Sequence, residues 1–283
     1  MHPFAGVAPL LKGSDLQLTT IGIFDSGLGG LTGYRALREL LPHQNLIYFG
    51  DTARVPYGTR SREVIRRYAL QDARFLLSRN VDAILVACGT ASSNALDLLE
   101  QTFSLPFVGV VAPAAERAAR CAAGGDGRVL VLGTAATVAT GAYERAIHAL
   151  DSSIEVRSVA CPLFVPLVEN GHTRKGDVAA TAIAQEYLLP HAAFRPDAVL
   201  LGCTHYPLLM EVIADVLPEP VLISAGDASA RAMARLIGES KTDVPGSDEF
   251  FTSDDPEVFY REASRFLGAP PASPVQHVEI ERY

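Results

Sequence analysis

Short apolar runs alternate along the chain with longer segments in which apolar residues recur every three or four positions. The runs are rich in Val, Ile and Leu, and a turn separates each from the helical segment that follows. Continuous apolar runs of this length are typical of buried parallel strands joined by helices. The pattern therefore predicts an α/β fold. We expect strands at residues 21–24, 46–50, 82–87, 107–111, 128–133, 154–160, 197–202, 220–224 and 249–253.

Two of the predicted strands end at cysteine in closely similar contexts. DAILVAC ends at Cys88, and DAVLLGC ends at Cys203 about one small domain later. A fainter match pairs IGIFDSG, followed by Thr32-Gly33, with VLVLGTA, followed by Thr140-Gly141. This repeat predicts two pseudo-symmetric α/β domains with parallel sheets. Ligands bind at the carboxyl ends of such strands, so we expect the active site in the cleft between the domains.

Turn-forming residues suggest where the chain passes between the two domains. We expect residues 21–112 and 227–268 to form the first domain, and residues 113–226 to form the second. Residues 1–20 are expected to be a loose N-terminal extension. Residues 269–283 contain Pro270, Pro271 and Pro274 and are expected to be an irregular tail.

Composition narrows the classes of partner. The 283 residues are 48% hydrophobic and 20% charged, which suits one large core or two domains. A net charge of −8 and the lack of a Lys/Arg run argue against nucleic acid as a partner. No apolar run approaches the length of a membrane span, and the opening residues lack the basic region of a signal peptide. Four cysteines without a CxxC motif favour free thiols and a cytoplasmic location.

A pair of thiols at equivalent strand ends suits a reaction that moves a proton from one face of a carbon to the other. Racemisation requires two acid/base groups on opposite sides of the substrate, one thiolate and one thiol. Each cysteine is expected to lie just before a helix, with Thr90 and Thr204 at the helix starts. We therefore expect the helix dipole and free N–H groups to lower the pKa of both thiols.

Other interpretations of the cysteines remain open at this stage. Each could be a buried structural residue, although the repeated context argues against this for the pair. A zinc site built from Cys88, Cys203 and His205 would lack a fourth ligand with suitable local spacing, so we expect no metal. Cys121 and Cys161 are expected to serve packing alone.

Several further residues are candidates for the site. Residues 24–30 follow the first strand and can cradle an anion such as a carboxylate, yet they lack the third glycine of a dinucleotide fingerprint. Within this segment Asp25 could instead be only a helix cap. His205 could relay a proton for Cys203 or be a capping residue. Glu169 could assist or be solvated, and Tyr57 could close a pocket or cover a core edge.

At this point the motifs resemble those of the glutamate racemases, within the aspartate/glutamate racemase superfamily. FDSGLGGLT, IYFGDTARVPYGTRS, VACGTASSNAL, CPLFVPLVENG and LGCTHYPLL occur in family order between about residues 21 and 224. The resemblance implies two flavodoxin-like domains, an active site between them, no cofactor, and supply of D-glutamate for peptidoglycan. Family members are often dimers, so a homodimer is a possible assembly.

The resemblance also implies roles for individual residues. Cys88 would act on the D-isomer and Cys203 on the L-isomer. Asp25 would assist Cys88, while His205 and Glu169 would assist Cys203. The implied substrate contacts are Asp25, Ser26, Tyr57, Gly58, Gly89, Thr90, Thr204 and His205.

Two positions depart from the usual family pattern. Gly89 follows the first cysteine where the family usually has Asn, and the run Ala112-Pro-Ala-Ala replaces an acidic-Pro-Gly run. The loss of the Asn side chain motivates a second hypothesis, a racemase of aspartate or another acidic amino acid. A third is a binding protein without turnover, which would have no need of two opposed thiols. Pyridoxal phosphate is not expected, because lysine occurs only at Lys12, Lys175 and Lys241, none within a recognisable motif.

Overall fold

The protein folds around two separate parallel sheets. A computed structural model describes residues 19–238, 240 and 243–283. The expected loose extension at residues 1–20 lies outside this part of the chain, apart from Thr19 and Thr20. Thr20 already belongs to the first strand.

Sheet A has six strands in the order β10-β9-β2-β1-β3-β4, and every neighbouring pair is parallel. Its strands are β1 (Thr20–Asp25), β2 (Asn45–Gly50), β3 (Ala83–Val86), β4 (Phe107–Gly109), β9 (Asp248–Thr252) and β10 (Val275–His277). The chain leaves this sheet after β4 and returns to it with β9, which pairs with β2.

Sheet B has four strands in the order β6-β5-β7-β8, again all parallel. Its strands are β5 (Arg128–Gly133), β6 (Glu155–Ala160), β7 (Ala198–Leu201) and β8 (Val221–Ser224). The order repeats that of β2-β1-β3-β4 in sheet A and is the flavodoxin-like order. The prediction of two α/β domains with parallel sheets is confirmed.

Helices cover both faces of sheet A. The helices α2 (Arg62–Ser78) and α3 (Gly89–Thr102) bury their apolar residues against one face. The other face packs against α1 (Leu31–Leu40), α10 (Ala225–Ile237) and α11 (Pro256–Leu267). Because both faces are covered, the central strands β1, β2 and β3 are largely apolar and buried, as the sequence pattern indicated.

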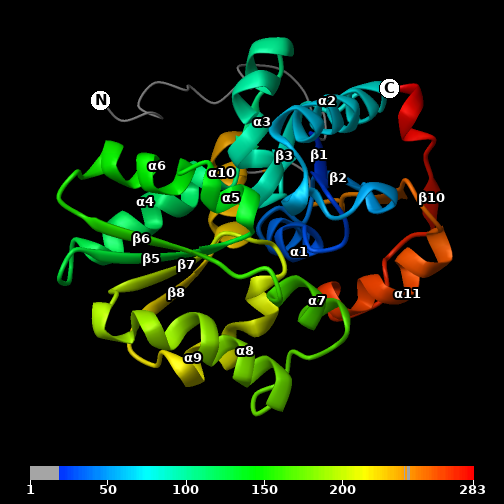
Figure 1. The fold of residues 1–283 in the computed structure, drawn as a ribbon. Coiled ribbons are helices and arrows are strands. Elements are labelled where there is room, and N and C mark those ends of the chain that lie inside the picture. Colours follow the sequence, from blue (N-terminus) through cyan, green and yellow to red (C-terminus); the bar gives the residue numbers. More distant parts are fainter. Residues whose placement is uncertain (1–18, 239, 241–242) are drawn as a thin grey trace.

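Sheet B is also a central layer between helices (Figure 1). The helices α4 (Val111–Ala122) and α6 (Ala142–Leu150) lie on one face, and α8 (Val178–Leu188) and α9 (Met210–Val216) lie on the other. The remaining short elements are η1 (Thr52–Arg54), η2 (Tyr57–Thr59), α5 (Ala135–Ala139), α7 (Phe164–Glu169), η3 (Leu189–Phe194), η4 (Tyr206–Leu209) and η5 (Ile280–Arg282).

The C-terminal tail differs from its prediction. Residues 269–283 were expected to be irregular, but β10 adds a parallel edge strand to β9, and η5 follows it. The prolines precede β10, where they do not interrupt its hydrogen bonds. The domain boundaries expected near residues 113 and 226 fall within α4 and α10. The exact boundaries stay predictions.

Candidate active site

The two cysteine-bearing corners meet where the domains adjoin. Cys88 follows β3 and Cys203 follows β7, and both residues are buried, with 4% and 8% of their surface exposed. A Cβ atom built on Gly89 would lie 2.0 Å from the carbonyl oxygen of Gly202 and 3.8 Å from the Cα of Cys203. The missing side chain therefore lets the backbone of one corner rest directly on the other. The usual Asn at this position would need a wider separation.

The Cys88 sulfur is held by short-range hydrogen bonds. Cys88 is the N-cap of α3, its Sγ accepts from the backbone N–H of Ala91 at 3.4 Å, and it donates to the Ser26 hydroxyl at 3.5 Å. The expectation of a lowered pKa is nevertheless wrong for this thiol. Burial, together with the nearby Asp25 carboxylate, outweighs these bonds and raises the pKa of Cys88 to about 12.

Asp25 is a fully buried carboxyl group at the end of β1. Its Oδ2 accepts from the backbone N–H of Gly27 at 3.0 Å, and its Oδ1 has no hydrogen-bond partner among the described residues. Burial raises the pKa of Asp25, against the opposing effect of His205. It is not a side-chain cap of α1, whose N-cap is Gly30. Asp25 can therefore accept a proton or a hydrogen bond.

Cys203 lies beside a histidine that a carboxylate holds from its other side. The Nδ1 of His205 is 4.0 Å from the Cys203 Sγ, and its Nε2 is 3.2 Å from the Glu169 Oε1. Burial opposes a charge on His205, but the hydrogen bonds to Cys203 and Glu169 outweigh it and raise the pKa of the ring to about 10. His205 is thus an imidazolium at neutral pH.

No α-helix starts directly after Cys203, contrary to expectation. The chain enters the 3-10 helix η4 at Tyr206, with Pro207 in its first turn, and α9 begins only at Met210. The helix dipole invoked for both cysteines therefore applies to Cys88 alone. Beside Cys203 the positive group is His205.

The segment after β1 contacts the second domain. The Thr32 hydroxyl donates to the carbonyl oxygen of Thr204 at 3.3 Å. A Cβ on Gly29 would lie 2.3 Å from the Thr204 Oγ1 and 2.5 Å from the His205 Nδ1. Only a glycine lets this loop pack so tightly on the second cysteine corner.

Three threonine hydroxyls form a second bridge between the domains. Thr90 Oγ1 lies 3.0 Å from Thr134 Oγ1 and 3.4 Å from Thr137 Oγ1, and the latter two lie 3.0 Å apart. Only Thr90 was predicted. The fainter sequence repeat contained a signal for Thr134, because it pairs this residue with Ser26.

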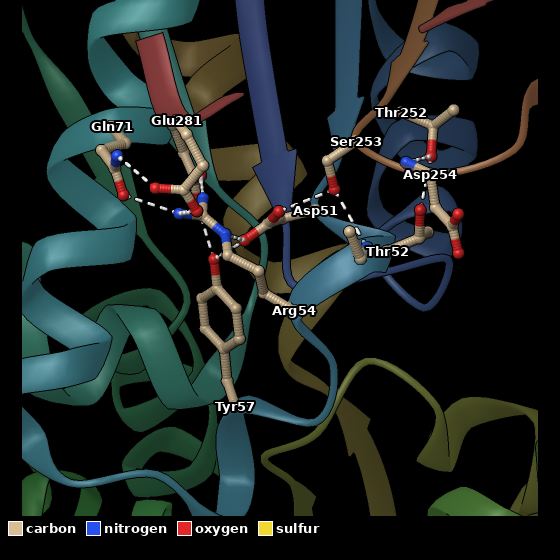
Figure 2. A network of polar contacts seen from close by, with 11 residues as sticks. Asp51, Thr52, Arg54, Tyr57, Gln71, Thr252, Ser253, Asp254 and Glu281 are labelled. Carbon is tan, nitrogen blue, oxygen red and sulfur yellow. Dashed lines mark hydrogen bonds and ion pairs between the residues drawn. The ribbon is translucent and has the colours of Figure 1, made fainter. Parts of the chain in front are cut away.

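The Tyr57 hydroxyl lies in a polar network of the first domain. The hydroxyl lies within hydrogen-bond distance of the Asp51 carboxylate and, at 3.0 Å, of the Asp72 carboxyl group, within a buried network that includes Arg54 (Figure 2). Its hydroxyl is therefore engaged inside the first domain. Its neighbour Gly58 does reach the other domain, since a Cβ there would lie 3.0 Å from the Thr134 Cβ.

Tyr143 is a buried residue that the sequence analysis missed. Its ring packs on Gly202, where a Cβ would lie 2.8 Å from the Tyr143 Cε2. Its hydroxyl has no hydrogen-bond partner among the described residues. Burial, followed by the charges of Cys203 and Cys88, raises its pKa. No spacing in the sequence marks this position.

Three further features concern metal binding, lysine chemistry and membrane insertion. The described residues contain no group of three or more His, Cys, Asp or Glu side chains that could hold a metal ion. Lys175 is exposed and pairs with Asp215 at 2.7 Å, and Lys12 and Lys241 lie outside the described residues. None of the helices in the described part of the chain has the length and apolar character needed to cross a bilayer.

The chain has two parallel-sheet α/β domains, and each contributes one buried thiol to the junction between them. This arrangement defines a class, the two-domain racemases. The sequence profile of the Asp/Glu/hydantoin racemase family matches residues 33–233, and the chain belongs to this family. It is an isomerase.

Relatives and solved structures agree over most of the chain. Glutamate racemase from Geobacter metallireducens is 46% identical over 253 residues, which are 88% of this chain and 92% of the relative. The structure of glutamate racemase from Francisella tularensis with D-glutamate superposes with a TM-score of 0.86 at 33% identity, covering 94% of this chain and 99% of the other. That of the Thermus thermophilus enzyme with β-chloro-D-alanine gives 0.81 at 42% identity, covering 94% and 98%.

An aspartate racemase from Picrophilus torridus shares the fold. Its TM-score is 0.57 at 20% identity, covering 78% of this chain and 94% of the other.

Proposed function

We propose that this enzyme interconverts L-glutamate and D-glutamate without a cofactor, by proton transfer between the substrate Cα and the thiols of Cys88 and Cys203. The observation that carries the mechanism is the contact between the two cysteine corners at Gly89 and Gly202. It brings one thiol from each domain to a single junction, as a two-base reaction requires. Similarity to glutamate racemases at 40–46% identity supports glutamate as the substrate.

The two thiols have different surroundings. Cys88, with a pKa near 12, begins as a thiol that can donate a proton. The imidazolium of His205 stabilises negative charge on the Cys203 sulfur. In the L-to-D direction, Cys203 takes the Cα proton of L-glutamate and Cys88 delivers its proton to the opposite face. In the reverse direction Asp25 can accept the Cys88 proton before the D-isomer reacts.

We propose that the substrate's polar groups are bound by residues around this junction. The free Oδ1 of Asp25 suits the ammonium group, and the hydroxyls of Ser26, Thr90 and Thr204 suit the carboxylates. Gly89 contributes only backbone. Because the Tyr57 side chain faces the buried network, we assign the contact at this loop to backbone groups of Tyr57 and Gly58.

Exchange of the Cα proton in D2O tests the mechanism. We expect the wild type to racemise glutamate, followed by circular dichroism, and to incorporate solvent deuterium at Cα. Cys88→Ala and Cys203→Ala should each lose racemisation, because each direction needs one thiol to take a proton and the other to give one. Cys121→Ala, a half-buried cysteine of α4, is the matched control and should retain activity.

Three results would refute the proposal. Full racemisation by either active-site variant would remove the two-thiol mechanism. Rapid turnover of aspartate with none of glutamate would replace the substrate, and binding of glutamate without any deuterium incorporation would favour a protein that binds but does not turn over. In the cell, we propose that the enzyme acts in the cytoplasm and supplies D-glutamate for peptidoglycan, and that it can form a homodimer.

A further inference from the structure

A hollow of about 470 Å³ lies between the two domains. Arg60 and Arg62 line it from the first domain, and Arg145 lines it from α6 of the second. No Asp or Glu is among the residues that line it. We name it the arginine hollow.

Arg60 and Arg145 are the two arginines of the hollow that no acidic side chain of the described residues neutralises. Arg62 lies 3.7 Å from the Asp97 carboxylate, which also pairs with Arg66. Neither Arg60 nor Arg145 forms an ion pair within the part of the chain that the structure describes, although Arg145 donates to the carbonyl oxygen of Thr140. Both are exposed, so their guanidinium groups are accessible to a ligand.

The arginine hollow shares Asn94 with the surroundings of the first cysteine corner. Asn94 lines the hollow and donates to the carbonyl oxygen of Thr90 at 2.9 Å. Thr90 is two residues from Cys88 and bonds to Thr134 across the domain junction. Asn94 therefore connects the hollow with the threonine bridge.

We propose that the arginine hollow is a capture site for the carboxylate of an acidic amino-acid substrate, outside the site of proton transfer. The inference rests on the proposed function and names a further binding site for the same substrate class. Guanidinium groups bind carboxylates through paired N–H donors. Unneutralised cations at the rim also raise the local concentration of an anionic substrate, which matters for a protein of net charge −8.

The position of the charges predicts a second effect. Arg60 and Arg145 belong to different domains and repel each other, although solvent screens the repulsion. A carboxylate bound between the two guanidinium groups offsets part of this repulsion.

Substitution of both arginines tests the capture site. We expect the double variant Arg60→Gln/Arg145→Gln to lower kcat/KM for glutamate about tenfold at low ionic strength, the lower range of electrostatic steering, with kcat unchanged. Salt should slow the wild type but barely affect the variant, because added ions screen the charges that the variant lacks. The double variant Arg60→Lys/Arg145→Lys keeps the charges and should retain most of the wild-type kcat/KM.

A matched control removes the same net charge elsewhere. Arg157 and Arg261 are exposed and pair with Glu155 and Glu262, outside the hollow, and Arg157→Gln/Arg261→Gln should keep the wild-type kcat/KM. The inference is overturned if the hollow variant matches this control, or if it loses kcat with KM unchanged. An inactive wild type would instead refute the proposed function, and this inference with it.

Discussion

His205 is buried between two groups that both favour its charged form. The imidazole contacts the Cys203 sulfur and the Glu169 carboxylate through different ring nitrogens, and its ring packs edge-on against Phe266. A raised histidine pKa means that the folded protein binds a proton more tightly than the unfolded chain does. The stabilisation is complete below the ordinary pKa of 6.5 and is lost as pH rises through about 10.

Replacement of this histidine should change the pH dependence of stability. We expect wild type to lose roughly 2–4 kcal/mol of unfolding free energy relative to His205→Gln between pH 6.5 and pH 10. Urea unfolding at several pH values, followed by far-UV circular dichroism, measures the difference. His172→Gln is the control, since His172 is half-exposed beside Asp177. A difference between wild type and His205→Gln that does not vary with pH would contradict this prediction.

Among the secondary-structure elements, η1 and η2 are anchored by a buried arginine. Arg54 pairs with Asp51 at 2.6 Å and with Asp72 at 3.0 Å, and it also contacts Gln71 and Glu281 (Figure 2). Both aspartates are fully buried. Loss of the arginine would leave two carboxylates in the core without a counter-charge, which is costly.

Removal of this arginine should destabilise the fold strongly. We expect Arg54→Met to lower the free energy of unfolding by about 3–5 kcal/mol at neutral pH. Arg66→Met, which breaks a surface pair with Asp97, should cost less than about 1 kcal/mol. Thermal and urea unfolding measure both variants. Similar losses for the two would show that the buried network contributes little.

The C-terminal segment is an integral element of sheet A. Val278 and Ile280 are buried in the core that α2 and α3 share with the sheet. Tyr283 packs edge-on against Phe75, and its carbonyl oxygen accepts from Arg74 at 3.0 Å. The segment therefore covers one end of the first domain.

Deletion of this segment should cost stability. A chain that ends at residue 272 loses β10 and two buried aliphatic side chains, and we expect its unfolding free energy to fall by about 3–6 kcal/mol. The double substitution Val278→Ala/Ile280→Ala should reproduce much of this loss with β10 present. An unchanged urea midpoint after the deletion would mean that the tail is dispensable.

The arrangement of the whole molecule depends on how closely the two domains approach. Gly89 and Gly29 let the loops of the first domain lie directly on Gly202, Thr204 and His205. A side chain at position 89 cannot be accommodated unless the cysteine corners separate. The relative position of the two thiols therefore depends on how the two domains pack together.

Addition of one methyl group at this contact should affect activity and stability together. We expect Gly89→Ala to cost about 1–3 kcal/mol of stability and to lower kcat by 10–100-fold, because a displacement of about 1 Å disturbs the alignment of reacting groups. The control is Gly124→Ala, whose Cβ would lie 3.6 Å from the Cys121 carbonyl oxygen, an ordinary contact. Activity of Gly89→Ala within twofold of wild type would show that the contact is not required.

The order of apolar and polar residues determined the layers of the molecule. Apolar runs predicted the strands because both faces of each sheet are covered, and the repeated strand-cysteine pattern predicted two related domains. Motifs in family order indicated the racemase family, which the comparisons confirmed. These features depend on local patterns, so a single sequence contains them.

Tertiary structure decided the features that depend on which side chains meet. The thiol pKa of Cys88 follows from burial beside Asp25, the Tyr57 hydroxyl is held by its contact with Asp51, and β10 forms because β9 offers an open edge. The arginine hollow likewise joins residues from both domains. Burial, charge proximity and strand pairing arise between segments far apart in the chain, and no local pattern encodes them.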